Sequence, residues 1–331
     1  MSLFSWLFGR RPTTVAPPAA VARAAPATPV PVRRAPKLDF SIGDRFVRIA
    51  ALDFFGQYSR SPDGTWVIAW RDGNDAGTRG GHRLDGPGRF YLFQNGDLVA
   101  QGRAERPNDG KVANDGSFII NDWRFASELN GTFYAYRSDG SLILKRDFAA
   151  NLVNNGIADD ASFAVCQCAN APHSADSSIL TIFDLRSGQQ IAAWVPDSGW
   201  ADHYSFPVDD TSIRLHYRGG ESFAYALDGN FIDRGAWIDS LARNGSGYVL
   251  HHVLREYGDA IPNELAKRIL VGLTTTANDP MQHAMALKVR GLCQEALDDP
   301  HDALESYDAA IAIDPKIGLK RRAAALRRRI S

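Results

Sequence analysis

The sequence predicts a mainly β body of about four four-stranded units, followed by an α-helical part built from a helical repeat. Three observations predict this fold class. An Asp-centred turn before an apolar strand recurs four times, a second tight turn alternates with it, and apolar residues take helical spacing after Ser240. The 29 glycines and the 10% of aromatic residues also fit a turn-rich β protein better than a helical bundle.

The chain begins with an apolar tip, residues 1–11, and a linker, residues 12–37. The linker holds seven of the 17 prolines and almost no large apolar residue, so it cannot form a core and is expected to be disordered and extended. The folded β body is therefore expected over residues 38–246.

The tip carries large apolar side chains ahead of two basic ones, Arg10 and Arg11. A secretory signal has the reverse order and a longer apolar region, so we do not expect one. The tip favours weak contact with a membrane surface or a docking role, and a disordered end is the alternative. Its apolar residues are Leu3, Phe4, Trp6, Leu7 and Phe8.

Two turn signals divide the body into repeats. The first is centred on Asp63, Asp115, Asp160 and Asp210, with spacings of 52, 45 and 50 residues. The second is Asn95-Gly96, Asp139-Gly140, Ser187-Gly188 and Asp228-Gly229, with spacings of 44, 48 and 41. Asn-Gly and Asp-Gly favour hairpins, and we attribute this to a need for positive φ at both central positions. The two sets interleave, so each unit reads as four strands.

In the first unit the strands are expected at 57–60, 65–70, 89–94 and 98–102. The third and fourth strands of later units are expected at 132–137 and 142–146, at 179–184 and 190–194, and at 222–227 and 230–235. The third strand, as in Phe90–Phe93, is apolar on both faces, which radially stacked propeller blades require. Residues 39–56 stay unassigned, either as a closing strand or as part of another blade.

The segment Ser61–Gly73, together with Phe90–Phe93, resembles the repeat of TolB-like and related WD40-like β-propellers. The match is good in the first unit and degenerate in the others. The resemblance implies blades and one rim that carries the loops between the second and third strands. It implies no activity, because this fold hosts many functions.

The longest insertion of the body, Arg71–Gly88, would lie on that rim. It is rich in glycine and in charged side chains, and such a loop can hold a ligand or a partner. A mobile surface loop is the alternative. The candidate binding residues on this rim are Asp72, Arg79, His82, Arg83, Arg124, His173, Trp200 and His203.

Helices are expected at 250–257, 263–276, 281–296 and 300–313, within a helical domain over 247–331. The segment Ala284–Pro315 resembles one tetratricopeptide repeat (TPR), which implies close packing of two helices and an extended peptide or helix as partner. Residues 319–330 would form the capping helix. The packing positions of the repeat are Leu287, Gly291, Ala303, Tyr307, Ala310 and Pro315.

The charge is distributed unevenly along the chain. Residues 1–38 hold six basic and no acidic side chains, and residues 316–331 hold seven and none. Residues 39–315 therefore carry 24 basic and 38 acidic side chains, a net charge of −14. The basic ends fold back on the acidic body or stay solvated, or the C-terminal run contacts phosphates or anionic lipid.

The three cysteines fit buried structural thiols in a reducing, cytoplasmic compartment rather than a disulfide framework. On a strand, Cys166 and Cys168 would face the same side. No phosphate-binding loop, HExxH or GxSxG motif occurs, so no catalytic residue, metal ligand or cofactor is predicted.

These patterns favour a non-catalytic scaffold with protein partners, cytoplasmic or tethered by its tip to the inner face of a membrane. One alternative is a hydrolase with its site on the propeller rim, which needs two carboxylates or a Ser–His pair within hydrogen-bond reach. Another is a nucleic-acid binder that uses the basic C-terminus, although nucleic acid is the less favoured partner.

Overall fold

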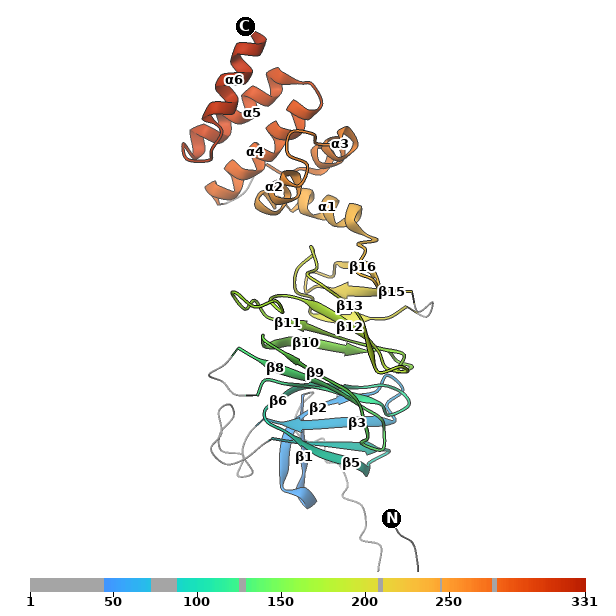
Figure 1. The fold of residues 1–331 in the computed structure, drawn as a ribbon. Helices are drawn as coiled ribbons and strands as arrows, with labels where there is room; N and C mark the ends of the chain where they lie inside the picture. The colour runs from blue at the N-terminus through green and yellow to red at the C-terminus, as the bar shows by residue number, and fades with distance from the viewer. Residues whose placement is uncertain (1–44, 73–87, 125–128, 208–210, 245, 276–278) are drawn as a thin grey trace, which may run out of the picture. The chain divides into compact units, whose positions relative to one another are not determined.

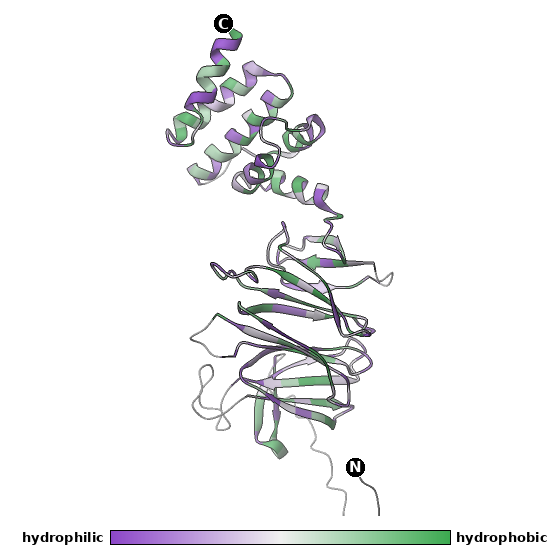
Figure 2. Cartoon of the chain, in the orientation of Figure 1, coloured by the Kyte–Doolittle hydropathy of each residue, from purple (hydrophilic) through white to green (hydrophobic). Residues whose placement is uncertain are grey.

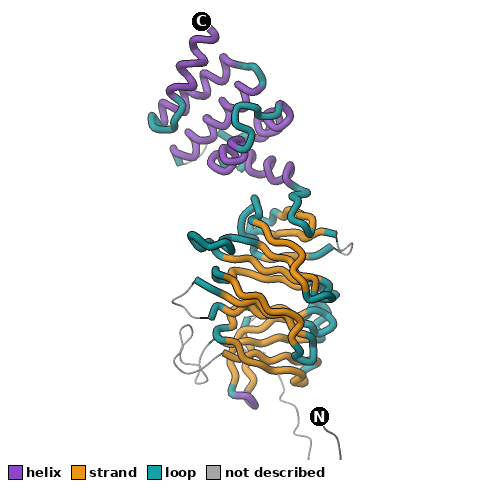
Figure 3. Tube along the Cα trace, viewed as in Figure 1, coloured by secondary structure: helices purple, strands orange, loops and turns teal. Residues whose placement is uncertain are grey.

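The computed structural model describes residues 45–72, 88–124, 129–207, 211–244, 246–275 and 279–331. The described strands precede the described α-helices along the chain (Figures 1 and 3). The strands form four small antiparallel sheets, and within each sheet the hydrogen-bonded neighbours follow chain order.

The first sheet has five strands: β1 (Phe46–Ile49), β2 (Phe54–Arg60), β3 (Trp66–Arg71), β4 (Gly88–Gln94) and β5 (Asp97–Ala104), with a 3₁₀ turn at Ala50–Leu52. The second has β6 (Pro107–Val112), β7 (Phe118–Asp122), β8 (Gly131–Tyr136) and β9 (Leu142–Phe148). The third has β10 (Leu152–Ile157), β11 (Phe163–Cys168), β12 (Leu180–Asp184) and β13 (Gln189–Trp194). The fourth has β14 (His203–Ser205), β15 (Ser212–His216) and β16 (Ser222–Ala226).

Both faces of the sheets are buried, as the apolar third strands predicted. On β4, Phe90 and Leu92 join a core shared with the second sheet, while Tyr91 and Phe93 pack on the opposite face. The second and third sheets share a further core, in which the rings of Phe133 and its partner Phe183 stack 4.8 Å apart. Figure 2 shows hydrophobic stretches along these strands. Four antiparallel sheets with shared cores make this body propeller-like.

The Asp-centred turns are held by the aspartate side chains. A carboxylate oxygen of Asp63 accepts a hydrogen bond of 3.0 Å from the backbone N–H of Thr65, two residues further on. Asp115 and Asp160 accept equivalent bonds from the second residue after each. The turn signal therefore has a local physical cause, because Asp satisfies a backbone donor that the turn exposes. The fourth position, Asp210, lies outside the described residues.

One of these hairpins is a residue shorter than the other two. The strand pairs Arg60–Val67 and Ile157–Ala164 enclose one residue more than the pair Val112–Phe118. Side chains alternate between the two faces of a strand, so the hairpin that is one residue shorter turns Phe118 toward the preceding sheet. Val67 and Ala164 occupy the equivalent face of their own sheets.

For the second set of turns, the explanation by positive φ at both central positions holds at one turn only. Asn95 and Gly96 both have positive φ, 50° and 90°. At Gly140, Gly188 and Gly229 the glycine alone is left-handed. The general explanation is therefore wrong for these three turns, where a single glycine in the left-handed region suffices.

Two expectations about the ends of the body are resolved. Part of the unassigned segment 39–56 supplies β1, which pairs with β2 as an extra strand of the first sheet. The predicted strand at 230–235 is wrong, since only a single bridge joins Phe231 to Tyr225 before helix α1 begins. Asp233 accounts for this change, because its carboxylate accepts the backbone N–H of Ala224 at 2.9 Å, where a longer strand would continue.

The helices are α1 (Arg234–Arg243), α2 (Gly247–Arg255), α3 (Asn263–Gly272), α4 (Pro280–Ala296), α5 (Pro300–Ile313) and α6 (Lys320–Ile330). Helix α1 was not predicted. Helices α4 and α5 both begin with Asp-Pro, where the Asp279 and Asp299 side chains accept backbone N–H groups and proline occupies the first turn.

The close approach of α4 and α5 depends on Gly291. A Cβ atom there would lie 2.6 Å from Cδ1 of Tyr307 and 3.1 Å from the carbonyl oxygen of Ala303. Tyr307, Ala303 and Ala310 are fully buried, Leu287 is nearly so, and Pro315 is exposed in the turn after α5. The predicted packing positions except Pro315 therefore lie in the helical core.

Within the described residues, no helix is long and apolar enough to cross a membrane. The thiols of Cys166, Cys168 and Cys293 are free and buried. Cys166 and Cys168 face the same core, as the strand pattern predicted, and burial raises the pKa of Cys168 to about 12.

Candidate functional site

Five of the eight predicted rim residues are described, whereas Arg79, His82 and Arg83 lie outside the described residues. Each of the five follows or begins a strand at one end of its sheet. They are Asp72, Arg124, His173, Trp200 and His203.

On this rim, polar side chains link the first, second and third sheets. The carboxylate of Asp72 lies 3.6 Å from Nε of Arg106, whose guanidinium lies 5.0 Å from the centre of the Trp123 ring. Trp123 donates through Nε1 to the carbonyl oxygen of Leu152 at the start of the third sheet. These contacts give Asp72 a structural role in linking the first and second sheets.

Sequence reasoning missed Asp122, which organises the same rim. Its buried carboxylate accepts the backbone N–H groups of Glu105, Arg106 and Arg124 at 2.7–3.0 Å. Arg124 has left-handed backbone (φ 51°), and its guanidinium lies 3.9 Å from Asp147. The signal available in the sequence was an aspartate at the end of an apolar strand, where an ionised side chain needs backbone donors.

His203 stacks on His216 across β14 and β15, with ring centres 4.3 Å apart. Nε2 of His216 lies 2.7 Å from the hydroxyl of Ser205, so a Ser–His pair is within hydrogen-bond reach. Burial, then the charges of His203 and Arg214, lower the pKa of His216.

This pair differs from a nucleophilic site in one respect. In the described part of the chain, no carboxylate bonds to the other imidazole nitrogen, so the ring is not oriented as a general base. His173 and Trp200 are exposed elsewhere on the rim. The described residues also contain no group of three or more His, Cys, Asp or Glu side chains that could hold a metal ion.

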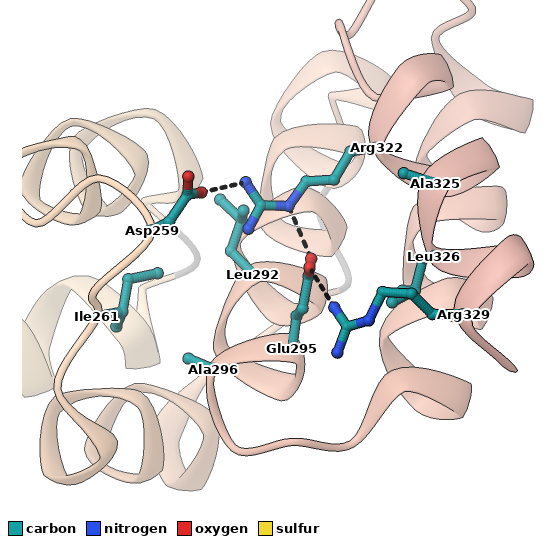
Figure 4. A pocket seen from close by; sticks show the side chains of 9 residues that line it. All are labelled: Asp259, Ile261, Leu292, Glu295, Ala296, Arg322, Ala325, Leu326 and Arg329. Carbon is teal, nitrogen blue, oxygen red and sulfur yellow. Dashed lines mark hydrogen bonds and ion pairs between the residues drawn. The ribbon is translucent and has the colours of Figure 1, made fainter.

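The helical segment contains an open cavity of about 470 Å³ (Figure 4). We call it the groove. Apolar side chains of α4 and α6 form its floor, and charged side chains lie along it. Its lining residues are Asp259, Ile261, Leu292, Glu295, Ala296, Arg322, Ala325, Leu326 and Arg329.

Glu295 is the centre of an ion-pair network in the groove. It accepts hydrogen bonds of 2.7 Å from Nε of Arg322 and from the hydroxyl of Tyr307, and Arg329 lies 3.6 Å away. Arg322 also donates from Nη1 to Asp259 at 3.1 Å (Figure 4). Glu295 is 17% exposed and Asp259 is 91% exposed. The first pair is therefore protected from solvent, whereas the second is open to competition from water and ligands.

Lys288 lies one turn before Leu292 on α4 and donates from Nζ to the carbonyl oxygen of Ile317 at 3.1 Å. Burial lowers the pKa of Lys288, and the charges of Arg255 and Arg322 lower it further. Burial, with Lys288 and Arg255, also lowers the pKa of His251 on α2 to about 4. Neither Lys288 nor His251 lines the groove.

Sequence reasoning named the residues that pack α4 on α5 and missed those that line the groove. The signal was present in α6, because residues 322, 325, 326 and 329 share one helical face. The sequence suggested a polar capping helix instead. The structure agrees that Ala323 and Leu326 bury one side of α6, and it adds a groove along the neighbouring side.

No family model matches this sequence, and no curated protein matches it. Solved structures that are similar over part of the chain include the following two. One, a crystal structure of the eukaryotic initiation factor, has 14% identity and a TM-score of 0.30 over 42% of this chain and 31% of its own. The other, the C-terminal WD40 domain of Sif2, has 12% identity and a TM-score of 0.33 over 56% of this chain and 52% of its own. The chain thus spans about a third and about half of these two structures.

Proposed function

We propose that this chain is a non-catalytic protein-interaction protein whose groove receives a segment of a partner. The observation that carries the proposal is the groove itself, an open cavity of about 470 Å³ with an apolar floor and ordered charged walls. A partner can bury apolar side chains against Ala296 and Ala325, while polar groups along the walls set its orientation.

The TPR-like repeat belongs to this proposal. The Gly291–Tyr307 contact lets α4 and α5 pack closely, and α4, α6 and the segment between α2 and α3 contribute the residues that line the groove. Stacked helix pairs of this kind create extended binding surfaces. We propose residues 247–331 as the helical domain and residues 38–246 as the propeller-like domain. Helix α1 lies inside the latter range, but its Trp237, Ile238 and Ala242 belong to the core of the helices that follow.

The rim is the second surface of the proposed scaffold, and the tip would tether it. The tip residues Leu3, Phe4, Trp6, Leu7 and Phe8 lie outside the described residues, as does the linker. A cytoplasmic protein held at the inner face of a membrane remains our prediction. Removing residues 1–9 should then disperse a tagged protein, and an unchanged distribution would exclude the tether.

A bulky side chain that fills the groove tests whether a partner binds there. Ala325 lines the groove and is exposed, whereas the adjacent Ala324 is exposed and does not line it. Ala325→Trp should therefore block a partner, while Ala324→Trp adds the same side chain outside the groove. The measurement is crosslinked affinity purification of the full chain from its native host, with partners quantified for wild type and both variants.

We expect at least one partner to be depleted more than tenfold by Ala325→Trp and retained by Ala324→Trp. Circular dichroism of both variants controls for helix content. Equal recovery of every partner by the two folded variants would refute binding in the groove.

A further inference from the structure

We propose that the outward face of α6 is a docking surface for an anionic membrane. Its cations, Lys320, Arg321 and Arg328, contact the phosphate groups of lipid headgroups, while the helix stays packed in the helical core. This face differs from the side of α6 that lines the groove. The inference therefore goes beyond the groove, and it adds a second contact to the tether that we propose for the tip.

Helix α6 lies in a segment that carries basic side chains and no acidic ones. Residues 316–331 hold seven Lys or Arg side chains and no Asp or Glu. A helix surface that serves only solubility carries both signs of charge interspersed, which avoids a strong field of one sign. The composition of this segment instead creates a local positive field, which attracts polyanionic surfaces.

The six cations of α6 divide into a paired and an unpaired set. Three of them lie within reach of a carboxylate from a neighbouring segment: Arg322, Arg327 and Arg329. Among the described residues, no carboxylate forms an ion pair with the other three, which are all exposed: Lys320, Arg321 and Arg328. The charge of this second set is therefore available to an external partner.

The unpaired arginines lie on the side of α6 that points away from the core. Ala323 and Leu326 are buried, and a helix turns by about 100° per residue, which places Arg321 and Arg328 on the opposite side. These two arginines are seven residues apart, about 10 Å along the helix. Between them lies the small, exposed Ala324. No bulky side chain of α6 therefore keeps a flat surface away from the two guanidinium groups.

Helix stability does not account for two of these cations. Lys320 and Arg321 occupy the first turn of α6, where the helix dipole is positive and acidic side chains are favoured. Within the described chain, no side-chain hydrogen bond caps this end, and the first turn holds no acidic residue. The two cations thus disfavour the helix that carries them, and a bound anionic surface would offset this effect.

The chemistry of the face favours lipid over nucleic acid. Besides its cations, the exposed residues at α6 are Ala324, Ala325 and Ser331. The face therefore has no aromatic ring on which a base could stack and no amide side chain that could read a base edge. Binding to headgroups needs neither, because a cluster of Lys and Arg is attracted to the negative surface as a whole.

A cationic face without an inserted apolar group holds a membrane reversibly, and stable anchoring takes two signals. The apolar side of α6 is buried in the helical core, so α6 does not supply the inserted group. The tip can supply it, because residues 1–11 include five large apolar side chains ahead of two arginines. The two contacts are therefore complementary.

The test is sedimentation of the full chain with vesicles. One set contains phosphatidylcholine with about 30% phosphatidylserine, and the other contains phosphatidylcholine alone. Wild type is compared with the α6 variant Lys320→Gln/Arg321→Gln/Arg328→Gln and with a control that changes net charge equally. The control is Arg103→Gln/Arg137→Gln/Arg243→Gln, at exposed positions outside α6. The tip is unchanged in all three proteins.

We expect the α6 variant to bind the anionic vesicles about tenfold more weakly than wild type and the control, because each lost cation removes attraction to the surface. The difference should shrink as salt is added. On phosphatidylcholine alone, the three proteins should bind equally through the tip. Equal binding of the α6 variant and the control to anionic vesicles would overturn the inference and leave the groove and its partner unaffected.

Circular dichroism verifies the helix content of each variant, and the single variants Arg321→Gln and Arg328→Gln test the face with less change to the helix. Binding of wild type to anionic vesicles that salt does not weaken would also overturn the inference. A mixed-sequence DNA duplex is the second ligand. If the α6 variant loses binding to the duplex but not to the anionic vesicles, the face binds nucleic acid and the lipid proposal is wrong.

Discussion

The ring of Tyr307 fills the space beside the backbone of Gly291, so that α5 crosses α4 where α4 has no side chain. Gly291→Ala should destabilise the chain by about 1–3 kcal/mol, because overpacking forces a buried ring or a backbone to move. Gly272→Ala is the control, since a Cβ atom there meets Ala242 at 3.4 Å, an ordinary contact. Urea unfolding followed by circular dichroism measures both, and equal stabilities would contradict the packing.

Replacing Asp122 even by the isosteric amide, asparagine, should lower the stability of the protein. Asp122→Asn places an NH₂ group or a weaker acceptor against three backbone N–H groups, those of Glu105, Arg106 and Arg124. We expect a loss of about 1–3 kcal/mol, the usual cost when a buried donor loses its partner. Asp97→Asn, at an exposed position of β5, should leave the urea midpoint unchanged. A matching midpoint for both variants would show that the bonds to Asp122 contribute nothing.

Two adjacent asparagines should respond in opposite ways. Asn154 donates from Nδ2 to the carbonyl oxygen of Ala201 at 3.0 Å, so Asn154→Ala should cost about 1 kcal/mol. Asn155 is 1% exposed and faces the core between the second and third sheets, and neither polar atom of its side chain has a hydrogen-bond partner among the described residues. Asn155→Val should therefore be neutral or stabilising. A loss above about 1 kcal/mol for Asn155→Val would show that its amide is paired.

Stability should fall as the pH is lowered from 7 to 5. The pKa of His251 is lowered from 6.5 to about 4, and that of His216 is also lowered, with burial as the first cause of both. The unfolded state then binds more protons than the folded state below about pH 6.5, so the stabilisation present at neutral pH is lost on acidification. Lys288, Arg255 and His252 contribute to the shift at His251.

The measurement is the urea midpoint of wild type and His251→Gln at pH 7, 6 and 5. The variant should show a weaker dependence on pH, because it removes one of the two groups. If the urea midpoints of the two proteins change equally with pH, His251 has the same pKa in the folded and the unfolded state.

Local signals in the sequence predicted the repeat and most of its strands correctly. Asp63, Asp115 and Asp160 mark turns because each side chain satisfies a backbone N–H two residues later, which needs no distant partner. The two-sided burial of Phe90–Phe93 could be read directly, since strand residues alternate between faces. Asp-Pro pairs at the starts of α4 and α5 were a further local signal, which sequence reasoning had not used.

Other features depended on contacts between distant residues. The predicted strand at 230–235 gave way to α1, and Asp233 bonds instead to Ala224 and Arg214. Asp122 was missed because two of its three donors, Glu105 and Arg106, lie ahead of β6 and reach it only when β6 and β7 pair.

The sequence by itself determined the four-unit β body and the helical segment after it, and its resemblance to a tetratricopeptide repeat implied the close packing of Gly291 with Tyr307. The first two follow from turn chemistry and periodicity, which act over a few residues. Only the tertiary structure decided where the groove lies and which charges line it. Arg322 meets Asp259 across 63 residues and Glu295 across 27, and no local pattern specifies such pairs, because they form only when separate helices pack.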